Sequence, residues 1–147
     1  MSGRSLLLLC GAAAAVYFLF FHAPPVPHDD YQGALALAAE KNRLVLLDFT
    51  GSDWCPACMK LDEEVFSQPE FREYARENLE MVVVDFPRTK PQKPDVREQN
   101  ELLRARFGVN AYPTLILVNA RGREIARRVG YLPGGPRAFR DWVDSVR

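Results

Sequence analysis

Short apolar runs alternate with amphipathic stretches along most of the chain. Residues 44–50 (LVLLDFT) and 81–86 (MVVVDF) are almost wholly apolar, which is typical of strands that are buried on both faces of a sheet. Residues 114–119 and 124–129 flank the turn 120–123 (ARGR), and this arrangement predicts a β-hairpin. The pattern therefore predicts short strands separated by stretches of helical periodicity.

Helical periodicity is found in the stretches that lie between and around these strands. Residues 31–42 are rich in helix formers, and a helix is expected to begin at Cys55. Residues 96–107 predict a helix that ends at Gly108, and residues 137–146 predict a closing amphipathic helix. The apolar positions expected in the helix after Cys55 and in the closing helix are Met59, Leu61, Val65, Phe66, Phe139, Trp142 and Val143.

The sequence SQPE at residues 67–70 is typical of a new helix start. Ser67 is expected to cap that helix, with Pro69 in its first turn and Glu70 completing a capping box. The proline-rich, polar stretch 87–94 is expected to be a loop.

The predicted order of elements is helix, strand, helix, strand, helix, strand, strand, helix. Buried strands that alternate with helices imply βαβ units, and the late hairpin adds an antiparallel part. We therefore expect an α/β fold with a central mixed sheet of about four strands and helices on both faces. This domain is assigned to residues 31–147, after a proline-rich linker at 24–30 and an apolar segment within residues 1–23.

The apolar segment is predicted to reside in a membrane. Residues 6–21 carry no charge and no proline, and as a helix they span about 24 Å, less than a hydrocarbon core of about 30 Å. An uncleaved anchor and a cleaved signal peptide are both considered. Phe21 and Pro24 flank Ala23, which makes a poor signal-peptidase site, and the aromatic end suits a membrane interface, so the anchor is favoured.

The distribution of charge indicates the side of the membrane on which the domain lies. Arg4 precedes the apolar run, whereas Asp29 and Asp30 follow it, and positive charge stays on the cytoplasmic side. The domain is therefore expected to face the periplasm or the exterior, or to be secreted there if the segment is cleaved. Disulfide chemistry is at home in that compartment.

Composition excludes several classes of function. The 147 residues suffice for one ordinary domain, and 19 Lys plus Arg balance 19 Asp plus Glu, so no nucleic-acid partner is expected. Of three cysteines, Cys10 lies in the apolar segment and is interpreted as lipid-facing, which leaves Cys55 and Cys58. Because His22 and His28 are the only histidines, a zinc site of about four ligands is not expected.

Cys55-Pro56-Ala57-Cys58 follows a predicted buried strand and opens a predicted helix. Unpaired N–H groups and the dipole at a helix N-terminus favour a thiolate, so Cys55 is expected to be the nucleophile. Cys58 lies one helical turn later and is expected to resolve a mixed disulfide on Cys55. A structural disulfide is the alternative, and the strand–turn–helix context favours the redox pair.

Three neighbouring features carry further candidate chemistry. Asp48 lies in a buried strand, where its pKa should rise, and it is a candidate for proton exchange with Cys58 unless it reaches water at the strand end. Trp54 is expected to shield the sulfurs and contact a client protein, or else to be a core aromatic. Pro113 follows Tyr112 and precedes a strand, which suits a cis peptide bond but also a proline at a strand edge.

These residues together resemble the thioredoxin superfamily over residues 31–147. The stretch TGSDWCPAC, followed by KLDEEVFSQPEF, is similar to the bacterial thioredoxin-like branch often found behind a signal or anchor. The resemblance implies a redox-active cysteine pair, a buried acid, a cis-proline facing the sulfurs and a glycine beside a substrate groove. The positions concerned are Cys55, Cys58, Asp48, Pro113 and Gly130, with Trp54 and Tyr112 expected to join the substrate-binding surface.

The chain departs from the thioredoxin pattern at several positions. One extra residue separates Asp48 from Cys55, Met81 stands where a buried lysine often partners the acid, and Glu63 replaces the usual helix-kinking proline. The dipeptide between the cysteines is Pro-Ala rather than Gly-Pro or Gly-His. The direction of exchange therefore stays open, although the lack of an imidazole between the cysteines favours a reductase or isomerase over an oxidase.

Together these features predict an extracytoplasmic thiol–disulfide oxidoreductase that exchanges disulfides with cysteine-containing client proteins and needs no cofactor. A reductase would receive its electrons from a protein in the membrane. The alternative is a membrane-anchored binding or assembly module of the same fold whose disulfide is structural. A peroxidase is disfavoured, because the predicted domain holds no cysteine besides Cys55 and Cys58.

Overall fold

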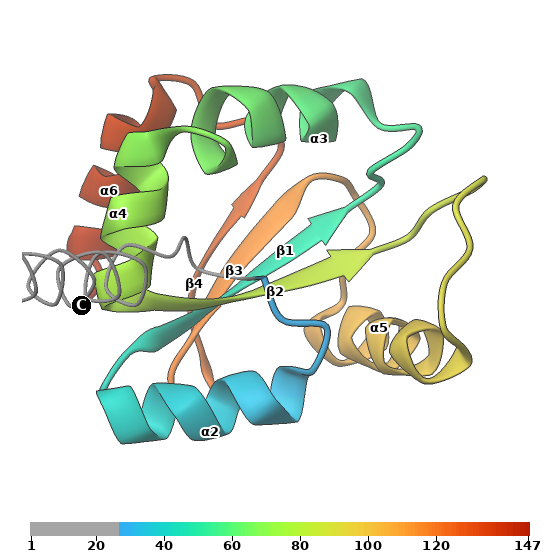
Figure 1. The fold of residues 1–147 in the computed structure, drawn as a ribbon, viewed down its shortest axis with the longest axis horizontal. Helices are drawn as coiled ribbons and strands as arrows, with labels where there is room; N and C mark the ends of the chain where they lie inside the picture. The colour runs from blue at the N-terminus through green and yellow to red at the C-terminus, as the bar shows by residue number, and fades with distance from the viewer. Residues whose placement is uncertain (1–26) are drawn as a thin grey trace, which may run out of the picture.

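The computed structural model describes residues 27–147, in which four strands form a single sheet in the order β2-β1-β3-β4 (Figure 1). The strands are β1 (Leu44–Thr50), β2 (Leu79–Asp85), β3 (Thr114–Val118) and β4 (Glu124–Val129). β1 and β2 are parallel, whereas the β1–β3 and β3–β4 pairs are antiparallel. The mixed sheet expected from the sequence is therefore confirmed.

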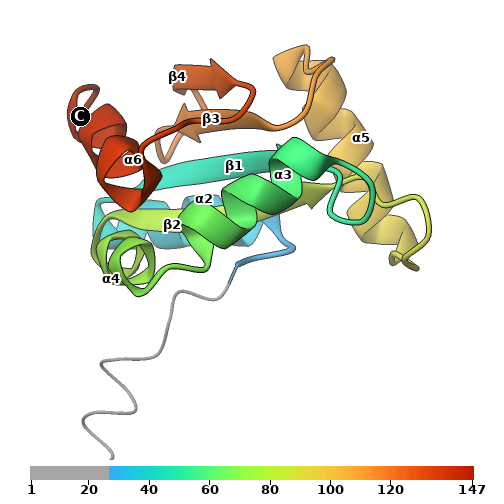
Figure 2. The ribbon, with the colours of Figure 1, turned by 90° about the horizontal axis from the view of Figure 1, so that it is seen from above.

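Helices cover both faces of the sheet, as Figure 2 shows from above. They are α2 (Tyr31–Lys41), α3 (Pro56–Leu61), α4 (Pro69–Asn78), α5 (Pro94–Phe107) and α6 (Gly135–Asp144), and a π-helical turn, η1 (Asp62–Phe66), joins α3 to α4. The side chains of α2 and α5 pack on one face, and those of α3, α4 and α6 pack on the other. The α/β architecture with helices on both faces is thus confirmed.

Alternation along β1 divides the core into two halves. Val45, Leu47 and Phe49 pack in the apolar cluster with α2 and α5, whereas Leu46 packs in the cluster with α3, α4 and α6. Every residue of β1 after the first is buried, as the apolar run predicted. Because successive side chains of a strand point to opposite faces, Asp48 lies on the same face as Leu46, toward α3.

The predicted capping box at the start of α4 is wrong. Ser67 has helical backbone angles (φ −77°, ψ −10°) and its N–H donates to the carbonyl of Asp62, so it ends the π-helical turn. The extended residue that precedes α4 is Gln68, and it makes no side-chain capping bond. Pro69 does occupy the first turn. The error arises because the preceding helix continues through a π-helical turn whose C-cap is Ser67, so Ser67 is not the residue that starts α4.

A buried carboxylate fastens the start of the described chain to the edge of the sheet. The backbone N–H of His28 donates to the carbonyl of Met81 (2.8 Å), and its imidazole contacts Glu80 (3.0 Å). Lys41 (3.1 Å) and Arg43 (2.8 Å) also donate to the Glu80 carboxylate. Burial alone would raise the pKa of Glu80, but these three hydrogen bonds outweigh it and the pKa falls.

The predicted membrane segment, residues 1–23, lies outside the described residues. None of the helices within residues 27–147 has both the length and the apolar character that crossing a bilayer requires.

Candidate redox site

Strand register brings four connections together at one end of the sheet. Because β1 and β2 are parallel, the segments that follow them leave the sheet at the same edge. β3 is antiparallel to β1, and Phe49 near the end of β1 pairs with Thr114 at the start of β3. Thr114 also pairs with Val129 at the end of β4. The segments around Cys55 and Phe86, the proline before β3 and the glycine after β4 therefore converge.

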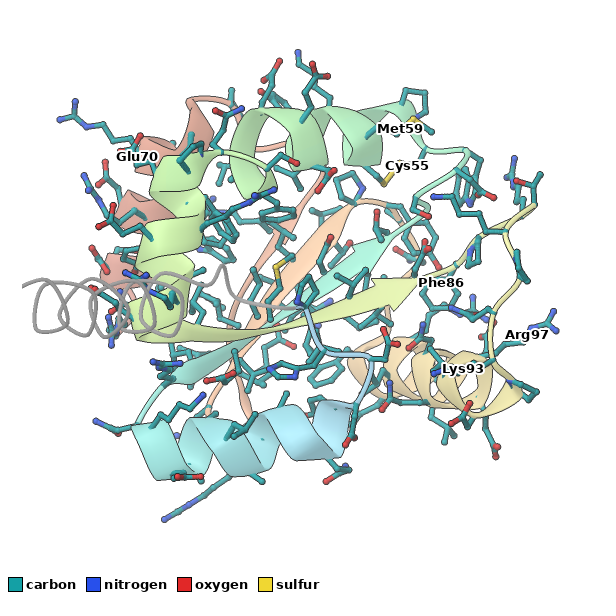
Figure 3. The ribbon with its side chains drawn as sticks, viewed as in Figure 1. Cys55, Met59, Glu70, Phe86, Lys93 and Arg97 are labelled. Atoms are coloured by element: carbon teal, nitrogen blue, oxygen red, sulfur yellow. A yellow bond between two sulfur atoms is a disulfide. The ribbon has the colours of Figure 1, made fainter. Side chains whose placement is uncertain are left out.

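Cys55 and Cys58 form a disulfide at the start of α3, with their Cα atoms 5.2 Å apart (Figure 3). Both residues are only 4% exposed. Cys55 is the N-cap of α3, with extended backbone angles, and its Sγ accepts a hydrogen bond from the backbone N–H of Cys58 (3.3 Å). A backbone N–H aimed at a sulfur is the kind of donor that stabilises negative charge on it.

Asp48 is buried beneath this disulfide. It is 6% exposed, and its Oδ1 has no hydrogen-bond partner among residues 27–147. Burial raises the pKa of Asp48 to about 7, and the negative charges of Asp62 and Asp85 contribute to the rise. The upward shift expected from its place in an apolar strand is therefore confirmed, and near neutral pH the group exists both with and without its proton.

A cavity of about 510 Å³ brings Asp48 and Cys58 together. Asp62 and Met81 also line it, and Lys90 contributes from the loop that follows β2. The cavity lies on the α3 side of the sheet, and Cys55 is not among its lining residues. Asp48 and Cys58 therefore share this space, whereas Cys55 does not line it.

The surface around the disulfide, called the rim below, includes Trp54, which directly precedes Cys55. Its indole Nε1 donates to the carbonyl of Phe86 (2.8 Å), and its ring packs edge-on against Tyr112, with centroids 5.7 Å apart. The guanidinium of Arg88 lies 4.0 Å from the centre of the indole. Gly51 is in close contact with the same ring, and a Cβ built there would overlap the indole. Trp54 is thus a half-buried surface aromatic held from several sides.

Pro113 and Gly130 lie at the same end of the sheet, where Pro113 is buried and Gly130 is half-buried. The Tyr112–Pro113 peptide bond is cis, as the resemblance implied. The carbonyl of Pro113 accepts a hydrogen bond from the backbone N–H of Gly130 (2.8 Å), and Thr114 Oγ1 donates to the carbonyl of Ala111 (2.8 Å). Gly130 has φ +86° with open space around its missing side chain, so its backbone conformation is what favours glycine.

Sequence reasoning missed two acidic residues of this site. Asp62 lies four positions after Cys58, and that helical spacing was an available signal that both line one face. Asp53 accepts hydrogen bonds from the backbone N–H groups of residues 88–90, a partner segment far along the chain. No local pattern indicates that pairing, because it depends on the register of β1 and β2.

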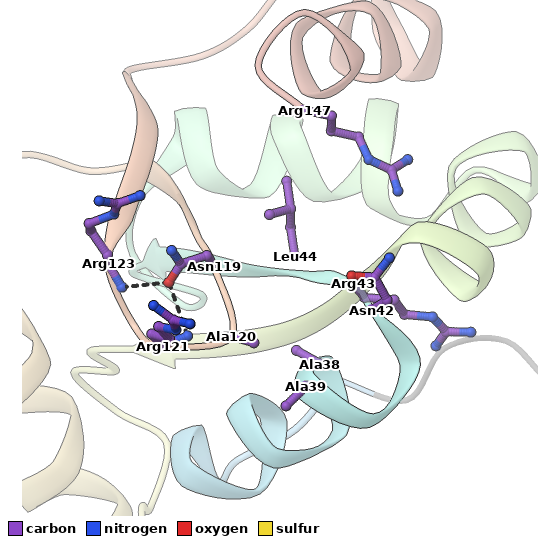
Figure 4. A pocket seen from close by; sticks show the side chains of 10 residues that line it. All are labelled: Ala38, Ala39, Asn42, Arg43, Leu44, Asn119, Ala120, Arg121, Arg123 and Arg147. Atoms are coloured by element: carbon purple, nitrogen blue, oxygen red, sulfur yellow. Dashed lines mark hydrogen bonds between the residues drawn. The ribbon is translucent and has the colours of Figure 1, made fainter.

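A second depression lies at the opposite end of the sheet. Its volume is about 570 Å³, and Figure 4 shows it between the end of α2 and the β3–β4 turn. Arginines line it, together with small apolar residues from α2 and the turn, and none of its lining residues is a cysteine. Among residues 27–147, no group of three or more His, Cys, Asp or Glu side chains is placed to hold a metal ion.

Comparison with known proteins identifies relatives of the same fold. Residues 31–147 match the family described as a thioredoxin-like domain. The chain is 36% identical to the disulfide bond reductase DsbH of Chlamydia pneumoniae, over 80% of this chain and 70% of that protein. It is 38% identical to the thioredoxin-related protein DsbJ of the same organism, over 68% of this chain but only 29% of that longer protein. A solved structure of a DsbH oxidoreductase superposes with a TM-score of 0.79 at 34% identity, covering 86% of this chain and 87% of that one.

Proposed function

The chain belongs to the thioredoxin-like family, within its branch of bacterial thiol–disulfide oxidoreductases, and we propose that it exchanges disulfides with cysteine-containing proteins outside the cytoplasm. The observation that carries this proposal is the geometry of the cysteine pair. Cys55 caps α3, whereas Cys58 lines an open pocket that Asp48 also lines. This difference supports Cys55 as the sulfur that meets a client and Cys58 as the sulfur that exchanges a proton.

The reductive half of the exchange begins with Cys55 as a thiolate. Its Sγ attacks one sulfur of a client disulfide, a bond forms between those two sulfurs, and the client's other sulfur leaves as a thiolate. Cys58 then loses its proton and attacks the Sγ of Cys55. The mixed disulfide breaks, the client departs with both sulfurs reduced, and the Cys55–Cys58 disulfide forms. The same steps in reverse oxidise a client dithiol.

Asp48 is proposed as the base that takes the proton from Cys58. Its carboxyl shares the cavity with Cys58 and has a pKa of about 7, so its ionised form is available near neutral pH and is a stronger base than an ordinary aspartate. Oδ1 of Asp48 has no hydrogen-bond partner among residues 27–147, so this oxygen is available to accept the proton.

The rim residues are proposed to hold the client chain. Trp54 and Tyr112 present adjoining aromatic rings beside the disulfide, and Pro113 and Gly130 are joined through a backbone hydrogen bond. An extended client segment that lies across these residues would bring its cysteine to Cys55. Trp54 is held by its hydrogen bond to Phe86, which keeps this surface in place before a client arrives.

The domain is proposed to be tethered by the apolar segment at residues 6–21, with a membrane protein supplying electrons if the chain acts as a reductase. Arg4 before that segment and Asp29 and Asp30 after it support an outward orientation. A reporter enzyme that works only after export should be active when fused after Arg147, and the fusion should remain with membranes after a carbonate wash. Full release into the soluble fraction would instead indicate a cleaved segment.

The roles of the two sulfurs are tested by trapping. In cells that carry full-length Cys58→Ala, non-reducing gels of membranes should show client proteins joined to Cys55, because the resolving thiol is missing. Cys55→Ala should trap none. Equal trapping by both variants would contradict the assignment. A reduction potential below roughly −300 mV, with no exchange activity, would instead support a structural disulfide in a binding or assembly module.

A further inference from the structure

A basic loop lies beside the disulfide. Residues 87–93 (PRTKPQK) join β2 to α5 and include Arg88, Lys90 and Lys93 but no acidic residue. In Figures 1 and 2 the loop runs next to the segment that joins β1 to α3. This neighbourhood follows from the parallel pairing of β1 and β2, whose carboxyl ends meet at one edge of the sheet.

Asp53 fixes the loop relative to the cysteines. Its carboxylate accepts hydrogen bonds from the backbone N–H groups of Arg88 (2.9 Å), Thr89 (2.7 Å) and Lys90 (3.0 Å), and from Thr89 Oγ1 (2.6 Å). The hydroxyl of Thr89 and then these N–H groups lower the pKa of Asp53 well below its usual range. Asp53 lies two residues before Cys55, so the loop has a defined position beside the disulfide.

The cationic groups of the loop are left without acidic partners. The guanidinium of Arg88 lies over the ring of Trp54 at 4.0 Å, and Lys90 Nζ donates to Ser52 Oγ at 3.2 Å. In the part of the chain that the structure describes, no carboxylate forms an ion pair with Arg88, Lys90 or Lys93. The carboxylate of Asp53 is occupied by N–H and hydroxyl donors. Asp53 keeps its negative charge while it accepts these bonds, but the three exposed cations of the loop outnumber this one carboxylate, and Arg88 lies directly over Trp54.

We propose that residues 87–93 recognise an acidic segment next to the reacting cysteine of the partner protein. This inference rests on the proposed disulfide exchange and specifies the chemistry of the partner. Fixed cations that face solvent attract a chain of opposite charge, raise its association rate and disfavour basic partners. Arg88 and Lys90 carry most of the effect, because Arg88 touches the rim aromatic and Lys90 lines the cavity that holds Cys58.

The same cations have a second conceivable effect, which is to stabilise the Cys55 thiolate. That effect would change the rate with every substrate by the same factor, whatever the charge of the substrate. Recognition of an acidic segment changes the ratio of the rates for differently charged substrates, and it weakens as salt screens the charges. The two effects are therefore separable by experiment.

The test uses reduced full-length protein in an uncharged detergent and three disulfide peptides of equal length. The residues that flank the peptide cysteines are aspartate, asparagine or lysine, and exchange is followed by stopped-flow tryptophan fluorescence. At about 0.02 M salt we expect the aspartate peptide to react about tenfold faster than the asparagine peptide, with the lysine peptide slower still. At about 0.5 M salt the three rates should converge.

Variants of the loop give the decisive comparison. Arg88→Gln/Lys90→Gln should bring the ratio of aspartate to asparagine rates close to one, and Arg88→Glu/Lys90→Glu should reverse the preference toward the lysine peptide, which a folding defect cannot imitate. The matched control is Arg121→Gln, which removes one charge from the depression at the opposite end of the sheet (Figure 4) and should keep the wild-type ratio.

Three results would overturn the inference. These are equal rates for the three peptides with the wild-type protein, an unchanged ratio in the Gln double variant, and equal slowing of all three peptides in that variant. Failure of the proposed function has a different signature, because the asparagine peptide would then fail to exchange with the wild-type protein at all.

Discussion

Replacing Asp48 with asparagine should change how stability depends on pH. The pKa of Asp48 is raised from 3.8 to about 7, so the folded protein binds this proton more readily than the unfolded chain does. Below pH 3.8 the group is protonated in both states and carries no penalty. As pH rises toward 7 the unfolded chain ionises while the folded protein resists, and the fold is progressively destabilised.

The size of the effect follows from the two pKa values. A difference of about 3 units corresponds to about 4 kcal/mol, because each unit is worth 1.36 kcal/mol. This loss is nearly complete at pH 8 and has only begun at pH 4. Asparagine has no such titration. Its amide adds a cost of about 1–3 kcal/mol if its N–H donors stay unpaired in the cavity, but that cost does not depend on pH.

The assay is denaturant unfolding of oxidised full-length protein and Asp48→Asn, followed by the fluorescence of Trp54 and Trp142, across pH 4 to 8. The difference in free energy of unfolding, variant minus wild type, should rise by about 4 kcal/mol from pH 4 to pH 8. Using the change across pH removes any constant penalty of the amide. The variant should also slow single-turnover reduction of a disulfide peptide at the step in which Cys58 loses its proton.

A free-energy difference that stays constant between pH 4 and pH 8 would contradict the conclusion that burial without a cationic partner raises the pKa of Asp48. If exchange rates are untouched as well, Asp48 has no part in proton transfer. Slower exchange together with a flat stability difference would mean that Asp48 acts with an ordinary pKa. Asp62→Asn is the matched control, because it removes a neighbouring negative charge that raises the pKa of Asp48. The substitution should lower the pKa of Asp48, so the free energy of unfolding of this variant should change less between pH 4 and pH 8 than that of the wild type.

Two further substitutions test how the site and the sheet edge are held. Gly51→Ala should displace the indole of Trp54, because a Cβ at this position overlaps the ring. The variant should lose about 1–3 kcal/mol of stability, exchange disulfides more slowly and show a shifted tryptophan emission. An unchanged emission spectrum would contradict the close packing. Glu80→Gln should cost about 1–3 kcal/mol at pH 7, because the buried carboxylate accepts hydrogen bonds from His28, Lys41 and Arg43. Because the pKa of Glu80 is lowered, the wild type should lose this advantage as pH falls through and below 4.5, and a loss that appears only at high pH would contradict this reasoning.

The sequence predicted the layout of the fold because its strongest signals are local. The buried strand at residues 44–50, the cysteine pair after it and the late hairpin each depend on neighbouring residues, and all three are present in the structure. The predicted capping box at Ser67 is wrong because the helix before it ends in a π-helical turn. The hydrogen bond of a π-helical turn spans one residue more than that of an α-helix, and nothing in the pattern signalled that Ser67 would close such a turn.

The charged surroundings of the disulfide were beyond sequence reasoning because they come from distant segments. Asp53 holds residues 88–90, and Trp54 bonds to the carbonyl of Phe86, so both contacts depend on the pairing of β1 with β2. The cysteine pair and the two residues between its members can be recognised from the local sequence. The charges that surround them are set by strand register, and a single sequence does not reveal register across more than thirty residues.

The raised pKa of Asp48 determines both the stability that the fold loses when Asp48 ionises and the free energy of the proposed proton transfer. Proton transfer from a thiol with an ordinary pKa of about 8.5 to a carboxylate with a pKa of 3.8 is uphill by more than 4 units, or about 6 kcal/mol. With a pKa of about 7 for Asp48, the same transfer is uphill by about 2 kcal/mol. The difference of about 4 kcal/mol equals the stability that the folded protein loses when Asp48 ionises, because both arise from the same burial of the carboxyl. A cation beside Asp48 would restore stability and weaken the base by the same amount, so the apolar Met81 in this cavity favours proton transfer at the expense of stability at neutral pH.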